Sequence, residues 1–306
     1  MVSCLSVAVS RKALAGAAAL AVLIAAAILV WLYSPWRSLD ARSLLAELPA
    51  GDGLTVFVDA RALRQSGILQ RLAGEAGAES EEYRAFVAAT GFEYRRDLDA
   101  FVLRSEDGRR WIVAEARLDY AKLRRYFLAH GGRCVSELCS MQGSAPERQI
   151  SWVRLQSGRL GMAVNPDPLA AAAFGEKTQG LSWPAPDAPL WLYLPGRMLE
   201  APDGAPAWLT LAVDGLRGAR WLLWSAKPEG GGLRLRLEIQ CAGADKAQEM
   251  ASRWGGVLES LREAARQNGD QVSLPAILAE GSVQARGERV EGLWQIEWGR
   301  LEKLLP

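Results

Sequence analysis

The sequence predicts an α+β protein in which one N-terminal transmembrane helix precedes two tandem, related domains, each with an antiparallel sheet and helices on one face. Three observations predict this arrangement. An uncharged apolar run occupies Ala13–Tyr33, strand and helix patterns follow in the same order twice, and a proline-rich segment separates the two series. Each series has the β-α-β-β-α-β order of a ferredoxin-like unit with an extra strand, which indicates an internal duplication.

The run Ala13–Tyr33 has the length of a membrane-spanning helix. It contains no charged residue, Asn, Gln or Pro, and as a helix it would extend about 31 Å. Trp31, Tyr33 and Trp36 at its exit are typical of the membrane interface, where aromatic side chains gather. A cleaved signal peptide is the competing interpretation, but its apolar core is usually shorter. We therefore expect an uncleaved single-pass anchor that contacts the lipid bilayer through residues 13–33.

The basic residues beside this run predict its orientation. Arg11 and Lys12 precede it, while Arg37 and Arg42 follow it at a greater distance. The adjacent pair in the short leading tail favours a cytoplasmic N-terminus, because Lys and Arg are enriched on the cytoplasmic side of membrane proteins. Residues 1–12 are then a short cytoplasmic tail, and the C-terminal domains are extracytoplasmic.

Proline and glycine mark the predicted domain boundaries. The expected segments are a tether at 34–53, a first α+β domain at 54–175, a proline-rich linker at 176–189 and a second α+β domain at 190–306. A segment with this density of proline joins neither a central strand nor a helix interior, because proline lacks the backbone donor that both require.

In the first half, strands are predicted where β-branched and aromatic residues cluster, and helices where a capping residue precedes an amphipathic stretch. The pair Asp107-Gly108 predicts a tight hairpin between two of these strands. The expected strands are Leu54–Val58, Leu98–Arg104, Arg110–Leu118, Ile150–Leu155 and Arg159–Val164. The expected helices are Ala60–Ala73, Ser80–Thr90 and Tyr120–Ala129, with a short Ala-rich helix that ends near Gly175.

The second half repeats this order. Apolar and charged residues alternate along Gly232–Cys241, which is the pattern of a half-buried strand. The expected strands are Leu190–Leu194, Gly218–Ser225, Gly232–Cys241, Ala279–Ala285 and Arg289–Trp298. The expected helices are Asp245–Gln267 and Arg300–Leu305.

Composition and motifs exclude several classes of function. The 306 residues include 36 Lys and Arg and 35 Asp and Glu, so the net charge of +1 provides no footprint for nucleic acid. The chain lacks the glycine-rich phosphate loops, the HExxH zinc motif and the GxSxG nucleophile motif. We therefore predict no catalytic residue, no cofactor and no metal site.

Acid–base chemistry has few candidate residues. Asp97 and Asp99 are two residues apart at the start of a strand, so their side chains would point the same way. General acid–base work is one interpretation, but the adjacent arginines favour an ion-paired strand entry. His130 is the only histidine, and its place before Gly131 favours a structural role at a helix C-terminus.

Cysteine and arginine suggest two further features. Cys134 and Cys139 can form a disulfide across a small hairpin or loop if the domains are extracytoplasmic, whereas Cys241 on the apolar side of a strand is expected to be a buried thiol. Arginines are densest in the first half. One interpretation is a face that binds an anionic partner or lipid headgroups, and the other is a solvated surface whose charge is balanced by glutamates. They are Arg61, Arg64, Arg84, Arg95, Arg96, Arg104, Arg109, Arg110, Arg117, Arg124 and Arg125.

One stretch resembles a known group of proteins. The group carries a Leu-Pro pair, a hydrophobic strand that ends in Asp and a Leu-Arg-x-Ser pattern, and here these are Leu48-Pro49, Val56–Asp59 and Leu63–Ser66. The segments Thr90–Phe92 and Asp97–Asp99 extend the likeness. The chain thus resembles uncharacterised exported or membrane-anchored bacterial proteins, which implies a single-pass protein of the bacterial cell membrane with periplasmic domains. The resemblance supplies no activity.

Three functions are compatible with these features. The leading hypothesis is a non-catalytic, membrane-anchored protein that binds another protein at the membrane as a scaffold or accessory subunit. The second is a module that binds a lipid or another apolar ligand, which a continuous cavity lined by tryptophans would favour. The candidates for its lining are Trp191, Trp221, Trp224, Trp294 or Trp298. An enzyme of unrecognised type comes third. A cleft in which His130 lies beside Asp or Ser side chains would favour it.

Overall fold

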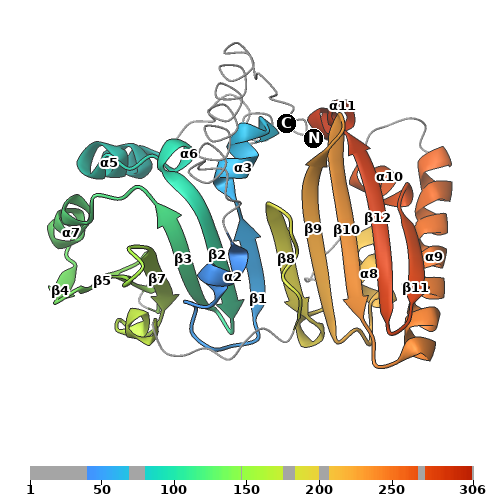
Figure 1. Cartoon of the computed structure of the whole chain (residues 1–306), viewed down its shortest axis with the longest axis horizontal. Coiled ribbons are helices and arrows are strands. Elements are labelled where there is room, and N and C mark those ends of the chain that lie inside the picture. Colours follow the sequence, from blue (N-terminus) through green and yellow to red (C-terminus); the bar gives the residue numbers. More distant parts are fainter. Residues whose placement is uncertain are drawn as a thin grey trace, which may run out of the picture. The chain divides into compact units, whose positions relative to one another are not determined.

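Twelve strands, each antiparallel to its neighbours, form one continuous sheet in the computed structural model (Figure 1). The structure describes residues 40–68, 80–145, 147–174, 183–199, 207–267 and 273–304. The chain divides into two units at residue 40, and the sheet belongs to the unit that comprises residues 41–306. The predicted α+β class and the antiparallel pairing are confirmed for these residues.

The strands match the predicted ones closely, with one additional hairpin. They are β1 (Leu54–Val58), β2 (Leu98–Glu106), β3 (Arg109–Ala116), β4 (Arg133–Val135), β5 (Leu138–Gln142), β6 (Gln149–Arg154), β7 (Leu160–Asn165), β8 (Leu190–Pro195), β9 (Trp221–Glu229), β10 (Gly232–Gln240), β11 (Ser282–Arg286) and β12 (Arg289–Glu297). Their spatial order is β11-β12-β10-β9-β8-β1-β2-β3-β7-β6-β5-β4.

The helices surround this sheet. They are α2 (Ala41–Leu45), α3 (Ala60–Gln65), α5 (Glu81–Thr90), α6 (Tyr94–Asp97), α7 (Tyr120–Ala129), α8 (Ala207–Gly215), α9 (Ala244–Gln267), α10 (Leu274–Ala279) and α11 (Trp298–Leu301), with 3-10 turns at η1 (Ala170–Ala173), η2 (Gly196–Met198) and η3 (Glu302–Leu304). Side chains of Asp59, Ser80, Asp119 and Ser273 accept hydrogen bonds from the first turns of α3, α5, α7 and α10. Such caps fix where a helix begins.

The prediction of two separate sheets is wrong. β1 of the first half pairs directly with β8 of the second half, from Thr55 opposite Tyr193 to Val58 opposite Leu190. Each is the first strand of its half of the chain, and each would be an open edge strand if its half formed a separate sheet. Pairing them satisfies the backbone groups that two separate edges would leave open.

The ferredoxin-like topology is also wrong, although the two halves do share a strand order. From the β1–β8 seam outward, the first half runs β1, β2, β3, β7, β6 and the second half runs β8, β9, β10, β12, β11. In a ferredoxin-like unit the first crossover joins parallel strands, whereas here β1 and β2 are adjacent and antiparallel despite the helices between them. The order of elements along the chain is the same in both topologies, so it does not show whether the second strand lies parallel to the first at a distance or antiparallel beside it.

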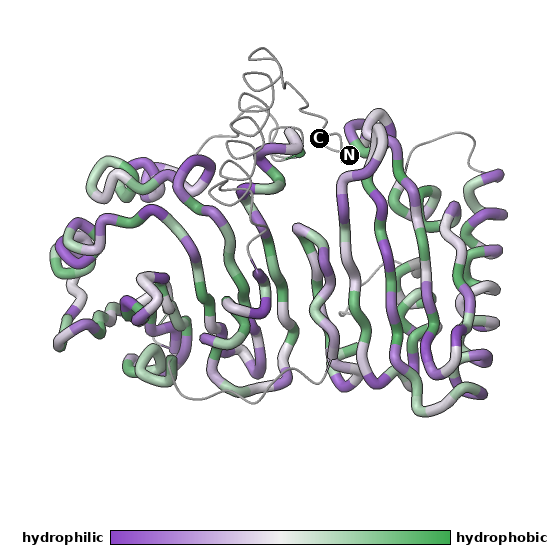
Figure 2. The backbone as a smooth tube through the Cα atoms, viewed as in Figure 1, coloured by the Kyte–Doolittle hydropathy of each residue, from purple (hydrophilic) through white to green (hydrophobic). Residues whose placement is uncertain are grey.

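The two faces of the sheet bury different cores. On one face, here called the α9 face, side chains of β9, β10 and β12 pack against α8, α9 and α10 around Trp254 and Trp294. Figure 2 shows apolar and polar residues alternating along these strands, as half-buried strands require. The same face of β5 and β6 packs against α7 through Leu123, Phe127 and Trp152.

The opposite face, here called the α2 face, contradicts the prediction that all helices cover one side. The segment 41–48, which was expected to belong to a tether, packs against β2 and β3, and Leu44 and Leu48 are fully buried. Arg159 holds this segment in place, because its guanidinium bonds Glu47 at 2.7 Å and Glu115 at 3.1 Å. The first half therefore carries helices on both faces.

The transmembrane anchor is not supported. Residues 13–33, together with Trp31, Tyr33 and Trp36, lie outside the described residues. Within the described ranges no helix has both the length and the apolar character needed to cross a membrane. The longest of those helices, α9, is amphipathic and carries charged residues along its length. The single-pass membrane localisation that depended on the anchor is accordingly not supported either.

Aromatic side chains reinforce the β1–β8 seam on the α2 face. Trp183 stacks on Tyr193 with ring centroids 4.3 Å apart and meets Trp191 edge-on at 5.2 Å. Trp191 in turn stacks on Phe57 of β1 at 5.5 Å, so the contacts reach across the seam. Trp183 is only 6% exposed, so this row belongs to the core.

We expect Trp183→Ala to lower the free energy of unfolding by about 3 kcal/mol, because it removes a buried indole and leaves a cavity. Trp183→Phe is the matched control and should cost about 1 kcal/mol, since an aromatic ring still stacks on Tyr193. Equilibrium unfolding in guanidinium chloride measures both variants. Equal losses for the two variants would show that the aromatic stack does not stabilise the seam.

Candidate functional site

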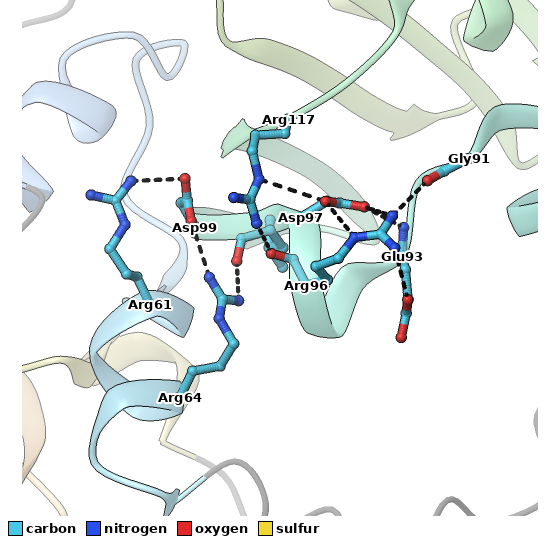
Figure 3. A network of polar contacts seen from close by, with 9 residues as sticks. Arg61, Arg64, Gly91, Glu93, Arg96, Asp97, Asp99 and Arg117 are labelled. Carbon is cyan, nitrogen blue, oxygen red and sulfur yellow. Dashed lines mark hydrogen bonds and ion pairs between the residues drawn. The ribbon is translucent and has the colours of Figure 1, made fainter. Parts of the chain in front are cut away.

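Two carboxylates lie where β1 ends, β2 begins and β3 ends, and each is shared by two arginines (Figure 3). Asp97 closes α6, and Asp99 follows it on β2. A shift in register between β2 and β3 at Leu98 and Ala100 accommodates this strand entry. The arrangement, here called the arginine–aspartate cluster, agrees with the ion-paired interpretation of the sequence.

Asp97 is held by charges from two different elements. Arg96 donates to it at 2.7 Å, Arg117 at the end of β3 lies 3.6 Å away, and the backbone N–H of Glu93 donates at 3.0 Å. The hydrogen bond from Arg96 is the main reason that the pKa of Asp97 falls to about 2. A carboxylate that stays ionised to this pH is a poor proton donor or acceptor near neutrality.

Asp99 ties α3 to the sheet. Arg61 and Arg64 of α3 reach its two oxygens at 2.7 and 3.0 Å, and Arg64 also donates to the carbonyl of Leu98. The hydrogen bond to Asp99 raises the pKa of Arg61. The side chain of Asp99 is 14% exposed, so these arginines take up most of its surface. Its role is to position α3 over the strand ends.

The other acid–base candidate, His130, has a structural role. Its Nδ1 lies 2.8 Å from the carbonyl of Tyr126, one turn earlier in α7, and its ring contacts the Tyr126 ring at 4.0 Å. His130 is the C-cap of the helix, and Gly131 follows it with φ of 80°. No Asp or Ser is described in contact with this histidine, so it forms no acid–base pair in the described part of the chain.

The cysteines form one disulfide and one buried thiol. Cys134 and Cys139 are directly opposite each other on β4 and β5 and are joined by a disulfide. The sequence left open whether they lie in a hairpin, and the structure places them on either side of the turn Ser136-Glu137. Cys241 is buried beside Met250 in the core of the α9 face, and burial raises the pKa of its thiol.

A second set of polar contacts lies at the opposite end of β1 and β2, beside the β1–β8 pairing. Arg104 is buried and donates to the carbonyl of Pro49 and to the hydroxyl of Thr55, and burial lowers the pKa of its guanidinium. The hydroxyl of Tyr193 donates to Asp52 at 2.8 Å, and burial raises the pKa of this tyrosine. These bonds join the chain before β1 to β2 and β8.

The tryptophans do not share a cavity. Trp191 and Trp221 lie on the α2 face, where Trp191 meets Trp183 and Trp221 lies against Tyr193. Trp224 and Trp294 contact each other at 5.0 Å within the core of the α9 face. The sheet therefore separates these two pairs, so any apolar cavity would be lined by one pair or the other.

The most distinctive surface is one that the sequence did not predict. On the α9 face, a straight row of apolar side chains crosses five neighbouring strands, and every member is partly exposed. The row consists of Leu192, Val56, Leu103, Ile112 and Met162, each directly opposite the next. A parallel row begins with Leu190, Val58 and Phe101.

We call the members of these rows on β8, β1, β2 and β3 the central apolar surface. It comprises Leu190, Leu192, Val56, Val58, Phe101, Leu103 and Ile112. Among the described elements, α8, α9 and α10 lie over the second half, where Leu192 of β8 contacts their core, and α7 lies over β5 and its neighbours. The packing described for these helices does not include β1. The opposite side chains of the same strands, such as Phe57 and Val102, are fully buried.

Metal chemistry has no basis in the described residues. Within them, no group of three or more His, Cys, Asp or Glu side chains is placed to hold a metal ion. The carboxylates with the most defined geometry, Asp97 and Asp99, are already bound by arginines.

Comparisons with known proteins give no family. No protein-family model and no curated protein matches the chain. Among solved structures, crystal form I of TP0453 has a TM-score of 0.48 at 10% identity, covering 85% of this chain and 95% of that chain. Crystal form III has the same score at 8% identity, covering 85% and 96%. Similarity at this level gives no information on function, and the resemblance to exported bacterial proteins stays a prediction.

We expect the stability of the protein to fall as the pH drops from about 4 to about 2. The folded pKa of Asp97 lies below its usual 3.8, so its contribution is present above that value and is lost as the carboxylate is protonated. The loss should be about 1–2 kcal/mol, less than the full linkage value because Arg96 and Arg117 are more than half exposed. Asp97→Asn, measured by urea unfolding at each pH, should flatten this part of the profile. An unchanged profile would contradict the assignment.

We also expect the disulfide to stabilise the β4–β5 hairpin modestly. Cys134 and Cys139 are five residues apart, and closing so short a loop restricts the unfolded chain by about 2 kcal/mol. The double variant Cys134→Ala/Cys139→Ala should lose this amount in urea unfolding. The matched control is Cys241→Ala, which keeps the disulfide. Its free energy of unfolding is measured under oxidising conditions, with the disulfide intact, and under reducing conditions, with the disulfide opened. A double variant as stable as the parent chain would exclude a stabilising role.

Proposed function

We propose that this is a non-catalytic binding protein that docks another protein, as a scaffold or as an accessory subunit of a larger complex. The observation that carries the proposal is the central apolar surface. A set of partly exposed Val, Leu, Ile and Phe side chains on adjacent strands is more apolar than the exterior of a sheet that faces only water. Aromatic and aliphatic patches of this kind are characteristic of protein interfaces.

The state of the candidate acid–base groups supports binding over catalysis. Asp97 and Asp99 each bind two guanidiniums, and His130 bonds a backbone carbonyl at a helix end. An enzyme that uses general acid–base catalysis needs a group whose pKa lies near the working pH. Asp97 is far from that condition, since its pKa is about 2.

The alternative is a module for a lipid or another apolar ligand. It would use the same side chains, but a small apolar ligand is normally held in a concave site that buries most of its surface. Trp191 and Trp294, two of the candidates for lining such a cavity, are buried among other aromatic side chains in the core. A row of side chains on a sheet fits a partner that brings its own extended surface.

The test is to isolate the tagged full-length chain from its native cells under non-denaturing conditions and to quantify every protein that accompanies it. We expect one partner in a fixed molar ratio that survives gel filtration, because an accessory subunit is bound continuously. A mock purification from cells with the untagged chain is the control. If the chain elutes alone and monodisperse, the proposal fails, and extraction of the sample for bound lipid then tests the alternative.

A further inference from the structure

We propose that the disulfide between Cys134 and Cys139 is a reducible latch, which an external dithiol opens in the folded protein by attack on Cys134. The inference does not depend on the proposed function. It rests on where the bond lies, on which of its two cysteines is exposed, and on how little else holds the strand that it fastens. Opening the latch releases β4 and makes β5 the edge strand at this end of the sheet.

The bond lies at the outer end of the sheet. β4 is the last strand in the spatial order, and it pairs with β5 through the three residues Arg133–Val135 (Figure 1). Cys134 and Cys139 are the central pair of this short ladder, so the disulfide crosses directly from one strand to the other. A change in this bond therefore acts on an edge strand and leaves the interior of the sheet intact.

The two cysteines differ in their access to solvent. Cys139 is fully buried and packs with Leu123 and Phe127 of α7 and with Trp152. Cys134 contacts the same cluster but stays partly exposed. In thiol–disulfide exchange a thiolate attacks one sulfur while the other sulfur leaves, and the more accessible sulfur is attacked faster. Access therefore selects Cys134 as the attacked residue and Cys139 as the leaving group.

The exchange proceeds in two balanced steps. One thiolate of the dithiol forms a bond to Sγ of Cys134, the bond between the two cysteines breaks, and its electron pair leaves on Sγ of Cys139. The second thiolate of the reagent then attacks the reagent's own sulfur in the mixed disulfide and releases Cys134. The two protons of the dithiol end on the two cysteines. The protein gains two electrons, and the dithiol is oxidised to an intramolecular disulfide.

Little else holds β4 once the bond is open. Val135 is 75% exposed and Arg133 is also exposed, so the strand buries little apolar surface. The turn opposes closure, because Ser136 has a φ of 53°, in the left-handed region that favours glycine. The side chain of Arg124 donates to the carbonyl of Ser136 at 2.8 Å, but this contact is exposed to water. A three-residue edge strand with such contacts opens locally when its covalent link is removed.

β5 keeps its place when β4 is released. It pairs with β6 from Cys139 to Gln142, and Cys139 lies directly opposite the buried Trp152. Reduction thus moves the edge of the sheet from β4 to β5 and uncovers the backbone donors and acceptors that faced β4. Because an open edge is a template for strand pairing, pairing at this end of the sheet becomes dependent on the redox state of the protein.

The first test follows reduction of the native full-length chain by dithiothreitol, with alkylation and mass spectrometry of the cysteine peptides. We expect the rate to rise in proportion to dithiothreitol and to stay constant within about twofold up to about 1 M urea, because the folded chain is the reactant. Cys241 is the internal control, since its buried thiol should stay unalkylated until the chain unfolds. A rate that levels off with dithiothreitol, or that rises with urea as global unfolding does, would overturn the inference.

The second test identifies the attacked sulfur. The native chain is exposed briefly to glutathione, a monothiol that leaves the mixed disulfide in place, and the reaction is quenched with iodoacetamide. Peptide mass spectrometry should find glutathione on Cys134 and carbamidomethyl on Cys139 in about nine of ten trapped molecules. Glutathione shared equally between the two cysteines, or found mainly on Cys139, contradicts the inference.

The third test compares amide hydrogen exchange in the oxidised and reduced chain. The amides of β4, and those of β5 that face it, should exchange about tenfold faster after reduction, whereas those of β6 and β7 should not change. The matched control is Cys134→Ala/Cys139→Ala, which should show the faster exchange without dithiothreitol and no further change with it. Equal protection of the hairpin in the oxidised and reduced chain would show that the bond is no latch.

Discussion

The pairing of β1 with β8 is the interaction on which the rest of the structure depends. It joins Thr55–Val58 to Leu190–Tyr193 and converts two half-sheets into one sheet of twelve strands. On the α2 face, the aromatic row of Trp183, Trp191 and Tyr193 packs over the pairing. At one end, the hydroxyl of Tyr193 donates a hydrogen bond to Asp52. Its α9 side carries the central apolar surface. Without this seam, the row of apolar side chains that we assign to partner binding would be divided between two separate sheets.

Much of the fold could be predicted because it is local. The strand Leu54–Val58 and the helix Tyr120–Ala129 have the predicted bounds, since caps and alternating patterns act over a few residues. The seam could not be predicted, because pairing between distant strands leaves no mark in either segment. The short β4 and the helices α2 and α10 were missed or placed in connections for a similar reason. The two helices are stabilised by packing, as the buried Leu44 and Ile277 illustrate, rather than by their own propensity.

The candidate site was predictable only in part. The neighbouring Arg95, Arg96, Asp97 and Asp99 indicated an ion-paired strand entry, and the structure contains one. The distant partners Arg61, Arg64 and Arg117 could not be assigned, because the topology of β1 to β3 brings them together. The central apolar surface was missed altogether, since Val56 and Leu103 look like ordinary core residues until the register shows their common face, over which no helix of the described ranges is seen to pack.

The mirrored strand order has a consequence for how the chain folds. Most neighbours in the sheet are hairpins or pairs within one half, whereas β1 and β8 are far apart in sequence and meet only when both halves exist. Until that moment each half exposes a complementary edge. Two partly folded chains can therefore satisfy each other's edges, with β1 of one molecule against β8 of another, which is the geometry of a domain-swapped dimer. The ratio of closed monomer to swapped dimer then depends on chain concentration during folding, and the length of the connection between β7 and β8, residues 166–189, influences how quickly the intramolecular pairing forms.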